Sequence, residues 1–461
     1  MSKSLTNLAY GIDFGTTNST VSVGRGLNKK QPLNLQIDKL AINREIMRSV
    51  IYVSPKMEFL FGKAAVDAYL TDVALGKGSK KKIIETGRMI KLAQPANAGG
   101  FVPDKIVPEI IEIEESDGGR LIQALKSNLS NEQVTHINLF GELKPIEWIV
   151  GQFLKEMKER ADEIMGIKIN KVLLGRPVEY VGGNNDFAVR RMKKAAEIAG
   201  FTEIQFEYEP VGAAFDFGVD IETNKIALIY DFGGGTLDIS IFKFPEKKVL
   251  ANVGLPIGGD HFNTEIFITK IAKYFGSELK YGINQLNLPS YIFTSLKNWY
   301  AISLLKNETF INDLEDFKFM NSDINSLNAL KSLVYNNLGF GIYEEIERVK
   351  KALSNKIAEI YKFDAKDIKI ASEVTRLVFE EILKNDLLEI KKILNKALGI
   401  AGLTSNDIDI VATTGGSSLI PVIHEQLVEM FGKEKIKKSD TFTSVARGLA
   451  IKAQEIYNHS E

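Results

Sequence analysis

Cysteine is absent from this chain of 461 residues, and tryptophan occurs only twice. Without cysteine the protein forms neither disulfide bridges nor thiolate metal sites. The sequence has no apolar run of roughly 18 residues, so we expect no membrane-spanning helix. Its start, MSKSLTNLAY, lacks the apolar core of a signal peptide. These absences predict a cytoplasmic protein with no membrane partner.

An excess of charge of one sign is also missing. The chain carries 58 Lys and Arg against 59 Asp and Glu, which gives a net charge of −1. This balance argues against a dominant nucleic-acid surface, and we expect no nucleic-acid partner. The histidines are scattered, so we expect no histidine metal site; they are His136, His261, His424 and His459. The length and the 44% of hydrophobic residues are enough for two or more lobes with their own cores.

The chain begins with the pattern of a β-hairpin. In residues 9–23, AYGIDFGTTNSTVSV, apolar residues alternate on both sides of a polar turn. Residues 48–62 predict another strand pair, the basic run KGSKKK at 77–82 predicts a solvated loop, and residues 95–145 look irregular, as in an insertion. From Ile146 onward helical and strand patterns alternate, which favours an α/β fold with parallel strands.

The first hairpin has a partner further along the chain. IDFGTTNSTVSV (residues 12–23) aligns with YDFGGGTLDISI (residues 230–241), so that Asp13 matches Asp231 and Gly15 matches Gly233. The offset, 231 − 13 = 218 residues, is nearly half the chain. Because internal similarity is weighed before any other fold argument, we predict two similar half-molecules that each offer one such hairpin.

The residues of these turns suit a phosphate group with a metal ion. Glycines let successive backbone N–H groups point into one concavity, and Thr16, Thr17 and Thr236 add hydroxyl donors. An aspartate next to a phosphate is tolerated when Mg²⁺ lies between the two, usually through water. Asp13 and Asp231 therefore indicate a magnesium nucleotide held between two lobes, and Asp238 could share the ion.

Four motifs resemble those of the actin-like ATPases, a superfamily that also contains sugar kinases and heat-shock chaperones. GIDFGTTNS (11–19) and YDFGGGTLD (230–238) resemble its two phosphate loops, and ATTGGSSLIP (412–421) resembles its adenosine loop. ERVKKALS (347–354) resembles the helix that distinguishes DnaK-type heat-shock chaperones from kinases and actins. The match is therefore closest to the ATPase domain of those chaperones. GRPV at 175–178 is similar to a short branch that keeps only this domain.

The resemblance implies an actin-like ATPase fold, with two lobes built on ribonuclease-H-like mixed sheets and the nucleotide in the cleft between them. We expect a first lobe at 1–215, a second lobe with a helical subdomain at 216–435, and a C-terminal helix at 436–461 that returns to the first lobe.

The resemblance also implies site residues for ATP or ADP and Mg²⁺. The expected catalytic residues are Asp13, Glu209, Asp231 and Thr236, and the expected residues around a hydrated Mg²⁺ are Asp13, Asp231 and Asp238. The expected nucleotide-binding residues are Gly15, Thr16, Thr17, Asn18, Gly233, Gly234, Gly235, Thr236, Gly259, Glu347, Lys350, Lys351, Ser354, Gly415, Gly416 and Ser417.

The sequence departs from the family pattern in three places. Direct alignment puts Gly87 where the family has its catalytic lysine, with Arg88 or Lys91 as possible substitutes; a missing lysine would weaken charge stabilisation during phosphoryl transfer. Leu419 and Lys351 replace the arginines that flank adenine, and an ammonium stacks less well than a guanidinium. The sequence also stops at residue 461 without the β-sandwich that binds peptides in these chaperones.

The leading hypothesis is an ATP-binding, slowly ATP-hydrolysing, chaperone-like protein. Closure of its lobes around the nucleotide would be read by a protein partner or co-chaperone. A small-molecule kinase of the same fold is the alternative among enzymes, and it would need an acidic general base facing a substrate pocket. An actin-like filament or nucleotide-switched scaffold, and a nucleotide sensor without hydrolysis, are the alternatives outside enzymology.

Overall fold

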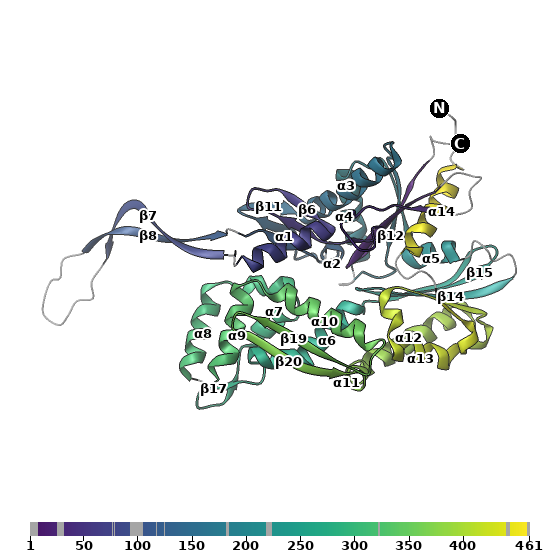
Figure 1. Cartoon of the computed structure of the whole chain (residues 1–461). Coiled ribbons are helices and arrows are strands. Elements are labelled where there is room, and N and C mark those ends of the chain that lie inside the picture. Colours follow the sequence, from purple (N-terminus) through teal and green to yellow (C-terminus); the bar gives the residue numbers. More distant parts are fainter. Residues whose placement is uncertain are drawn as a thin grey trace.

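The computed structural model describes most of the chain. The described residues are 8–24, 32–75, 77, 79–92, 105–116, 118–123, 125–180, 184–217, 224–320, 323–438 and 443–458. They form two stacked halves, each with its own β-sheet, and a long hairpin that extends to one side (Figure 1). We call the upper half in Figure 1 lobe I and the lower half lobe II. No helix in these ranges has the length and apolar character needed to cross a bilayer.

Lobe I is built on a mixed sheet that carries the first hairpin. Its strand order is β13 (Glu203–Tyr208), β12 (Lys171–Arg176), β1 (Tyr10–Phe14), β2 (Asn18–Val23) and β3 (Leu33–Asn34), and β4 (Met47–Arg48) also pairs with β2. β1 is parallel to β12 and antiparallel to β2. Val172 and Leu174 pack into the core beneath α3 (Ile146–Met165) and α4 (Asn185–Ile198), whereas Leu173 packs into a second layer. β12, an interior strand of this sheet, is thus buried on both faces, as parallel strands usually are.

Lobe II repeats this arrangement. Its main sheet has the order β16 (Lys248–Leu255), β15 (Leu237–Phe244), β14 (Lys225–Phe232), β21 (Ile410–Thr414) and β22 (Ile436–Lys438). β14 is antiparallel to β15 and parallel to β21, just as β1 is to β2 and β12. Asp231 pairs with Asp238 in the second hairpin, and the aligned residues Asp13 and Thr20 pair in the first. The internal similarity predicted from the sequence is confirmed.

Two helices lie between the sheets and join the lobes. They are α5 (Glu209–Phe217) and α14 (Ser444–Asn458), and their apolar residues share one buried layer with Leu173 of lobe I and Ile229 of lobe II. The helices cross at Gly212 and Gly448, where a Cβ on Gly448 would lie 1.6 Å from the Gly212 carbonyl oxygen. Only glycine permits this approach. The C-terminal helix packs on the first lobe. The domain boundaries at 215 and 435 stay a prediction.

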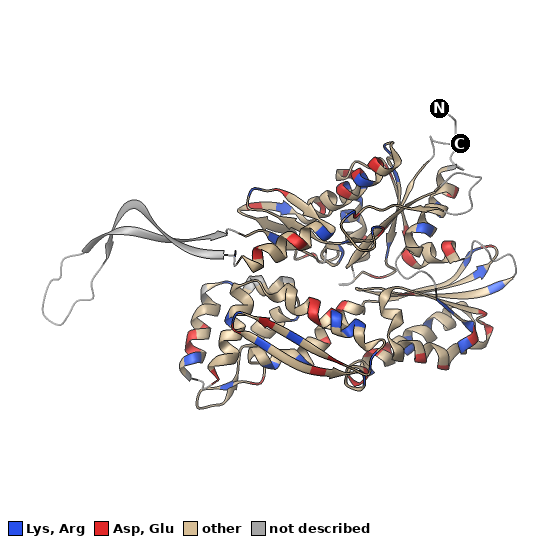
Figure 2. Cartoon of the chain, viewed as in Figure 1, with Lys and Arg blue, Asp and Glu red and all other residues tan. Residues whose placement is uncertain are grey.

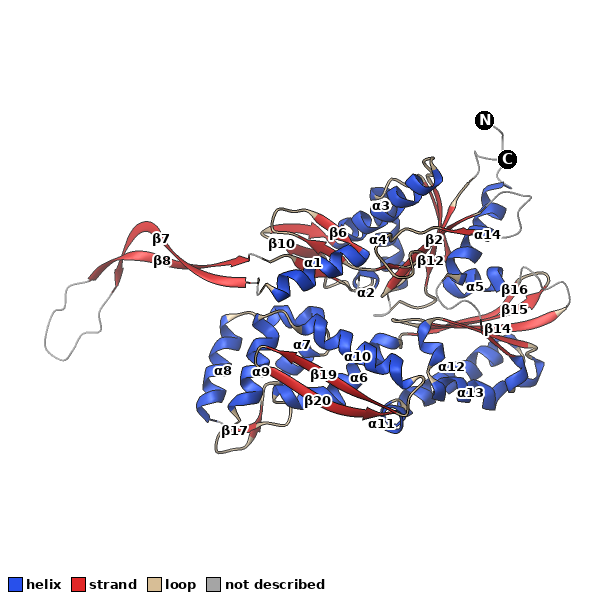
Figure 3. Cartoon of the chain, viewed as in Figure 1, coloured by secondary structure: helices blue, strands red, loops and turns tan. Residues whose placement is uncertain are grey.

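The predicted second strand pair is present as β5 (Ile51–Val53) and β6 (Phe59–Phe61), and it is extended by β9 (Arg120–Ile122). α1 (Gly62–Ala74) follows β6, and the chain then forms β7 (Ser79–Leu92) and β8 (Lys105–Ser116). These two strands pair only with each other among the described strands, and they extend away from both lobes (Figure 3). We call them the arm.

The arm corrects two predictions. The loop expected at KGSKKK is wrong, because residues 79–82 begin β7. Residues 95–104 lie outside the described residues, but the described part of 105–145 is more regular than expected: beyond β8 and β9 it contains α2 (Leu125–Leu129), β10 (His136–Leu139) and β11 (Glu142–Pro145). Charged and apolar residues alternate at 112–114 of β8, which is a strand pattern, whereas the basic run at the start of β7 does not alternate and so predicted a loop.

The remainder of lobe II is largely helical and shares one core with its main sheet. Figure 2 shows basic and acidic residues interspersed over both lobes. The other elements of lobe II are α6 (Gly259–Ile266), η3 (Phe267–Ile271), η4 (Ala272–Phe275), β17 (Lys280–Tyr281), β18 (Leu286–Asn287), α7 (Ser290–Leu296), η5 (Trp299–Leu305), α8 (Glu308–Met320), α9 (Ile324–Tyr335), α10 (Gly339–Leu353), β19 (Ala358–Ala365), β20 (Ile368–Thr375), α11 (Arg376–Ile382), α12 (Lys384–Ala401), η6 (Ser405–Asp407), η7 (Gly416–Leu419), α13 (Pro421–Phe431) and η8 (Lys433–Lys435).

Candidate functional site

The turns of the two matched hairpins face each other across the lobes. A Cβ on Gly234 would lie 2.5 Å from Oγ1 of Thr17, and a Cβ on Gly235 would lie 2.6 Å from Oγ1 of Thr16. A side chain at either glycine would therefore displace the opposite turn. The two turns together form one concave surface of backbone N–H and hydroxyl groups, the kind of surface that binds anions.

A cavity of about 180 Å³ lies between these turns, and we call it the phosphate site. Every residue predicted for catalysis or nucleotide binding lines it, although they come from segments far apart in the sequence. The predicted residues in the lining are Asp13, Gly15, Thr16, Thr17, Asn18, Glu209, Asp231, Gly233, Gly234, Gly235, Thr236, Gly259, Glu347, Lys350, Lys351, Ser354, Gly415, Gly416 and Ser417.

Asp238 is the one predicted site residue that does not line this cavity. Its side chain is buried, and its two carboxylate oxygens accept hydrogen bonds from the hydroxyl of Thr236 at 2.8 Å and the backbone N–H of Val178 at 2.7 Å. Val178 ends the GRPV motif, so this motif connects lobe I to the second hairpin. In the structure Asp238 orients Thr236 rather than facing the phosphate site.

Asp13 and Asp231 stand near the ends of their strands; Asp231 is buried and Asp13 is partly buried. Burial raises the pKa of Asp13 to about 7, with a further contribution from the charge of Glu209. Burial and the neighbouring carboxylates also raise the pKa of Asp231 well above its usual range. Burial and Glu209 raise the pKa of Asp238 to about 7. Acids concentrated in this way are stabilised by an added cation, because each repels the others in a medium of low polarity.

Lys126 supplies positive charge within this acidic group, although no motif in the sequence indicated it. It lies in the short helix α2 and lines the phosphate site, and its Nζ lies 2.5 Å from Oε1 of Glu209. Both side chains are 8% exposed. Burial alone would lower the pKa of Lys126, but Glu209 and Asp13 outweigh burial and raise it, so the ammonium stays charged.

Lys126 lines the phosphate site, whereas direct alignment put Gly87, with Arg88 or Lys91 as possible substitutes, where the family has its lysine. Gly87, Arg88 and Lys91 all belong to β7, and the arm carries them away from the site (Figure 1). Direct alignment failed because the arm lies between the second strand pair and the lysine. The signal that could have found Lys126 is the short stretch LIQALKSNL (residues 121–129), which follows the arm and leads into a helix.

Helix α10 brings the ERVKKALS motif (347–354) to the phosphate site. The Glu347 carboxylate lies 2.6 Å from Nζ of Lys350 and 3.3 Å from Nζ of Lys351, and it accepts a hydrogen bond from the amide of Asn263 at 2.9 Å. Burial would raise the pKa of Glu347, but Lys350 and Lys351 lower it to about 2. Lys350 also donates to the Gly259 carbonyl oxygen at 2.8 Å, which links α10 to the start of α6. The predicted contact of Glu347 and Lys350 with ribose hydroxyls stays a prediction.

The adenosine-loop motif forms the next wall. Ser417 donates a hydrogen bond to the Gly233 carbonyl oxygen at 2.8 Å, which joins this loop to the second phosphate loop. Ile420 lines the cavity, whereas Leu419 is 38% exposed. The side chain of Lys351 is 72% exposed, so both residues that depart from the family pattern are open to solvent.

Two contacts join the lobes beside the phosphate site. Arg48 of β4 donates to Glu344 of α10 at 2.8 Å, and the hydroxyl of Tyr69 in α1 donates to the carbonyl oxygen of Asn337. Asp260 was not predicted but lines the cavity; burial raises its pKa to about 6, although Lys350 opposes the shift. Because Glu344 and Glu347 share one helix, an opening of the lobes at Arg48 would also move the residues on the predicted ribose side.

The donor set fits a hydrated divalent cation better than a directly ligated one. Asp13 and Asp231 present carboxylate oxygen atoms to the cavity, and oxygen is the ligand that Mg²⁺ prefers. Among the described residues, no three His, Asp or Glu side chains are arranged to hold a metal ion directly. Mg²⁺ usually keeps several waters and is bound through one or two carboxylates plus phosphate oxygens, which is the set available here.

A mixed sheet in each lobe, two matched hairpins and an acidic cleft between them define an actin-like ATPase. A family model described as Hsp70 protein matches residues 9–288 and 336–459. The chain belongs to the Hsp70 family. Membership supports an ATP-binding, chaperone-like function, and the family binds ATP or ADP, generally with Mg²⁺. The unmatched residues 289–335 contain α7, η5, α8 and α9.

Proposed function

We propose that the chain is a magnesium-dependent ATPase that hydrolyses ATP slowly and signals the nucleotide state to a protein partner through movement of its lobes. The observation that carries this proposal is the convergence of Asp13, Asp231, Glu209 and Lys126 on one cavity between two matched hairpins. The charge pattern supports a phosphate with a cation, because unaided carboxylates and phosphate repel each other.

In this proposal each residue of the phosphate site has a role in positioning or charge. The N–H groups of the two glycine turns, with Thr16 and Thr236, bind the terminal phosphate. Bound Mg²⁺ would be held through water by Asp13 and Asp231, and it would neutralise charge on the phosphate oxygens. Lys126 neutralises further charge on the side of lobe I, and Glu209 orients the attacking water.

The small volume of the phosphate site implies that the lobes move relative to each other when a nucleotide binds or leaves. About 180 Å³ is smaller than the roughly 300–1,000 Å³ of typical small-molecule sites, so a nucleotide requires the lobes to separate further. The ion pair of Arg48 and Glu344 joins the lobes and would break or rearrange during opening. A partner that contacts both lobes could therefore distinguish the empty protein from the loaded one.

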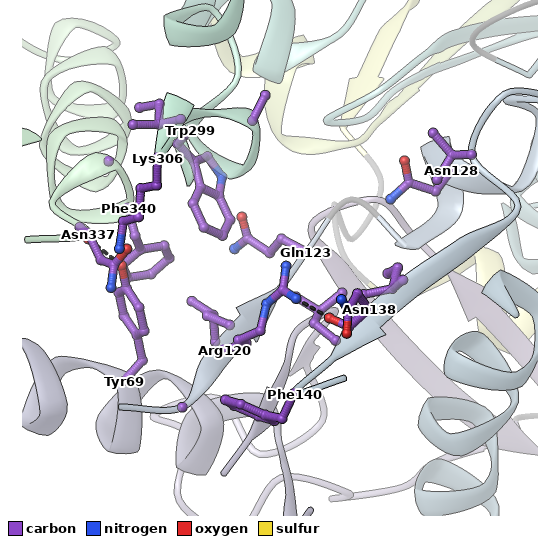
Figure 4. Close-up of a pocket in the computed structure, with 18 of the residues that line it drawn as sticks. Tyr69, Arg120, Gln123, Asn128, Asn138, Phe140, Trp299, Lys306, Asn337 and Phe340 are labelled. Atoms are coloured by element: carbon purple, nitrogen blue, oxygen red, sulfur yellow. Dashed lines mark hydrogen bonds between the residues drawn. The ribbon is translucent and has the colours of Figure 1, made fainter. Parts of the chain in front are cut away.

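The kinase alternative has less support. A second cavity, of about 1,060 Å³, lies between the lobes beside the phosphate site, and we call it the interlobe cavity (Figure 4). Among the described residues that line it there is no Asp or Glu to act as general base toward a substrate hydroxyl. This favours water as the acceptor of the phosphoryl group.

The test is single-turnover hydrolysis of γ-labelled ATP with Mg²⁺, with ATP binding measured on the same sample. Phosphate should appear slowly without any added acceptor. The double variant Asp13→Asn with Asp231→Asn should lose Mg-dependent binding. If the double variant binds Mg-ATP as well as the wild type does, the assignment of the site is wrong. Particle size measured by light scattering after ATP addition separates this proposal from a filament, which would grow.

A further inference from the structure

The interlobe cavity shares no lining residue with the phosphate site. One wall comes from lobe I, with β9, α2, β10 and the turn after β10. The other wall comes from lobe II, with η5 and the junction of α9 and α10. Tyr69 closes one end, since its hydroxyl donates to the Asn337 carbonyl oxygen. At about 1,060 Å³ the cavity is at the upper end of the range for ligand sites.

Amide side chains from both lobes converge on this cavity. Gln123 and Asn128 line it from lobe I and Asn337 lines it from lobe II, and each is partly buried. Within the described ranges, the amide groups of these three side chains take part in no hydrogen bond; Asn337 accepts from Tyr69 through its backbone only. A side-chain amide offers both donors and an acceptor, which matches the alternating C=O and N–H groups of an extended peptide chain.

Aromatic rings and positive charge complete the lining. Trp299 meets Phe340 edge to face at 5.4 Å, and in Figure 4 both rings project toward the space that Gln123 and Arg120 enter from the opposite wall. Arg120 and Lys306 place a cation on each wall, while no carboxylate of the described residues lines the cavity. Rings of this kind accept apolar side chains, and the cations favour a ligand with negative charge.

We propose that the interlobe cavity binds a short acidic peptide segment of a partner protein in an extended conformation. The amides of Gln123, Asn128 and Asn337 would pair with the peptide backbone. Trp299 and Phe340 would contact apolar side chains, and Arg120 and Lys306 would attract acidic ones. This inference rests on the proposed function, for which it supplies the partner. Because both lobes form the walls, a bound segment would hold the lobes at a fixed separation and so couple to the nucleotide through α2, which also carries Lys126.

The probe is an acetylated peptide of alternating leucine and glutamate with about six residues, roughly 20 Å long when extended. Its counterpart replaces each glutamate by lysine. The chain has two tryptophans, and Trp148 of α3 is not among the residues that line the cavity, so the Trp148→Phe protein reports on Trp299 alone. We expect the acidic peptide to shift the fluorescence of Trp299 in a saturable manner, and the basic peptide to leave it unchanged. Calorimetry on the wild-type protein gives an independent affinity.

Variants then test the residues. Gln123→Ala with Asn128→Ala should weaken the acidic peptide about tenfold or more, because two hydrogen bonds are lost. Lys306→Gln should weaken it as well, whereas Lys306→Arg should restore it. The matched control is Gln205→Ala with Asn395→Ala, which removes two exposed amides on β13 and α12 and should bind like the wild type.

The outcomes separate this inference from the proposed function, because Mg-ATP binding is measured on the same samples. If Mg-ATP binds but the acidic peptide binds no better than the basic one, the peptide site is refuted and the ATPase assignment stands. Equal affinity in the amide double variant and its control also refutes the peptide site. If the peptide binds as expected but Mg-ATP does not, the cavity is a peptide site and the ATPase assignment fails.

Discussion

Replacement of Lys126 by methionine tests the chemistry of the site most directly. Methionine has a similar length, so Lys126→Met removes the charge from a buried position without a large change in packing. The ammonium lies 2.5 Å from Glu209, and its charge lowers the pKa of Asp13 and Asp231. Its loss therefore leaves the carboxylates of Glu209, Asp13 and Asp231 without the ammonium that offsets their charge.

The expected loss of hydrolysis follows from this position. Removing one preorganised group that stabilises transition-state charge typically lowers the rate about 10²–10³-fold, and we expect a loss in this range. ATP binding should change less, because the glycine turns and α10 remain. Breaking a buried ion pair from one side typically costs about 3–5 kcal/mol, so the free energy of unfolding of the nucleotide-free protein should fall, by less if Asp13 takes up a proton.

The assay is single-turnover hydrolysis with saturating Mg-ATP, accompanied by denaturant unfolding of each variant. Lys126→Arg keeps the charge and should retain part of the activity. Arg88→Met and Lys91→Met, in the arm, serve as matched controls and should hydrolyse ATP like the wild type. If Lys126→Met were as active as the wild type, or if Lys91→Met lost as much activity, the role assigned to Lys126 would be wrong.

The same geometry leads to three further predictions. The nucleotide-free protein should lose stability as the pH rises from about 4.5 to 7, by up to roughly 2–3 kcal/mol per pH unit, because the raised pKa values of Asp13 and Asp238 make the folded state bind more protons than the unfolded one. Glu347, with its pKa lowered to about 2, opposes this only below that interval. Thermal melts at stepped pH would check the slope, and Mg-ATP should flatten it. Arg48→Ala should speed nucleotide release several-fold in stopped-flow measurements, since one contact between the lobes is lost; unchanged release would mean that this ion pair does not limit opening. Lys351→Arg with Leu419→Arg should tighten ATP binding about threefold to tenfold by calorimetry, because a guanidinium stacks on a base better than an ammonium does.

Local patterns made most of the fold predictable. Both hairpins follow from alternation around a glycine turn, and the similarity of the two hairpins is enough to predict that Asp13 and Asp231 lie close together. The resemblance to chaperone motifs predicted that Glu347 and Lys350 belong to the same site. The prediction of two matched hairpins was confirmed because it depends on short stretches whose geometry is nearly independent of the rest of the chain.

The features of the site that could not be predicted involve residues that are far apart along the chain. Lys126 was missed because counting from the second strand pair assumes a short connection, and the arm makes that connection long. Asp238 was expected near the metal, and this stays a prediction; the sequence did not show that its carboxylate accepts hydrogen bonds from Thr236 and Val178. The Val178 bond comes from a lobe I segment 60 residues away, a partner that no local pattern identifies.

The base of the arm makes the arm separable from the rest of the molecule. Asp72 accepts a hydrogen bond from the backbone N–H of Gly119 at 2.8 Å and pairs with Lys77 at 3.0 Å, so the chain leaves α1 and returns to β9 at nearly the same point. A chain segment whose two ends lie close together can change its length at a small cost in conformational entropy. Lobe I can thus accommodate arms of different length or sequence while Lys126 keeps its place, and the same position would accept a grafted reporter domain without disturbing ATP binding.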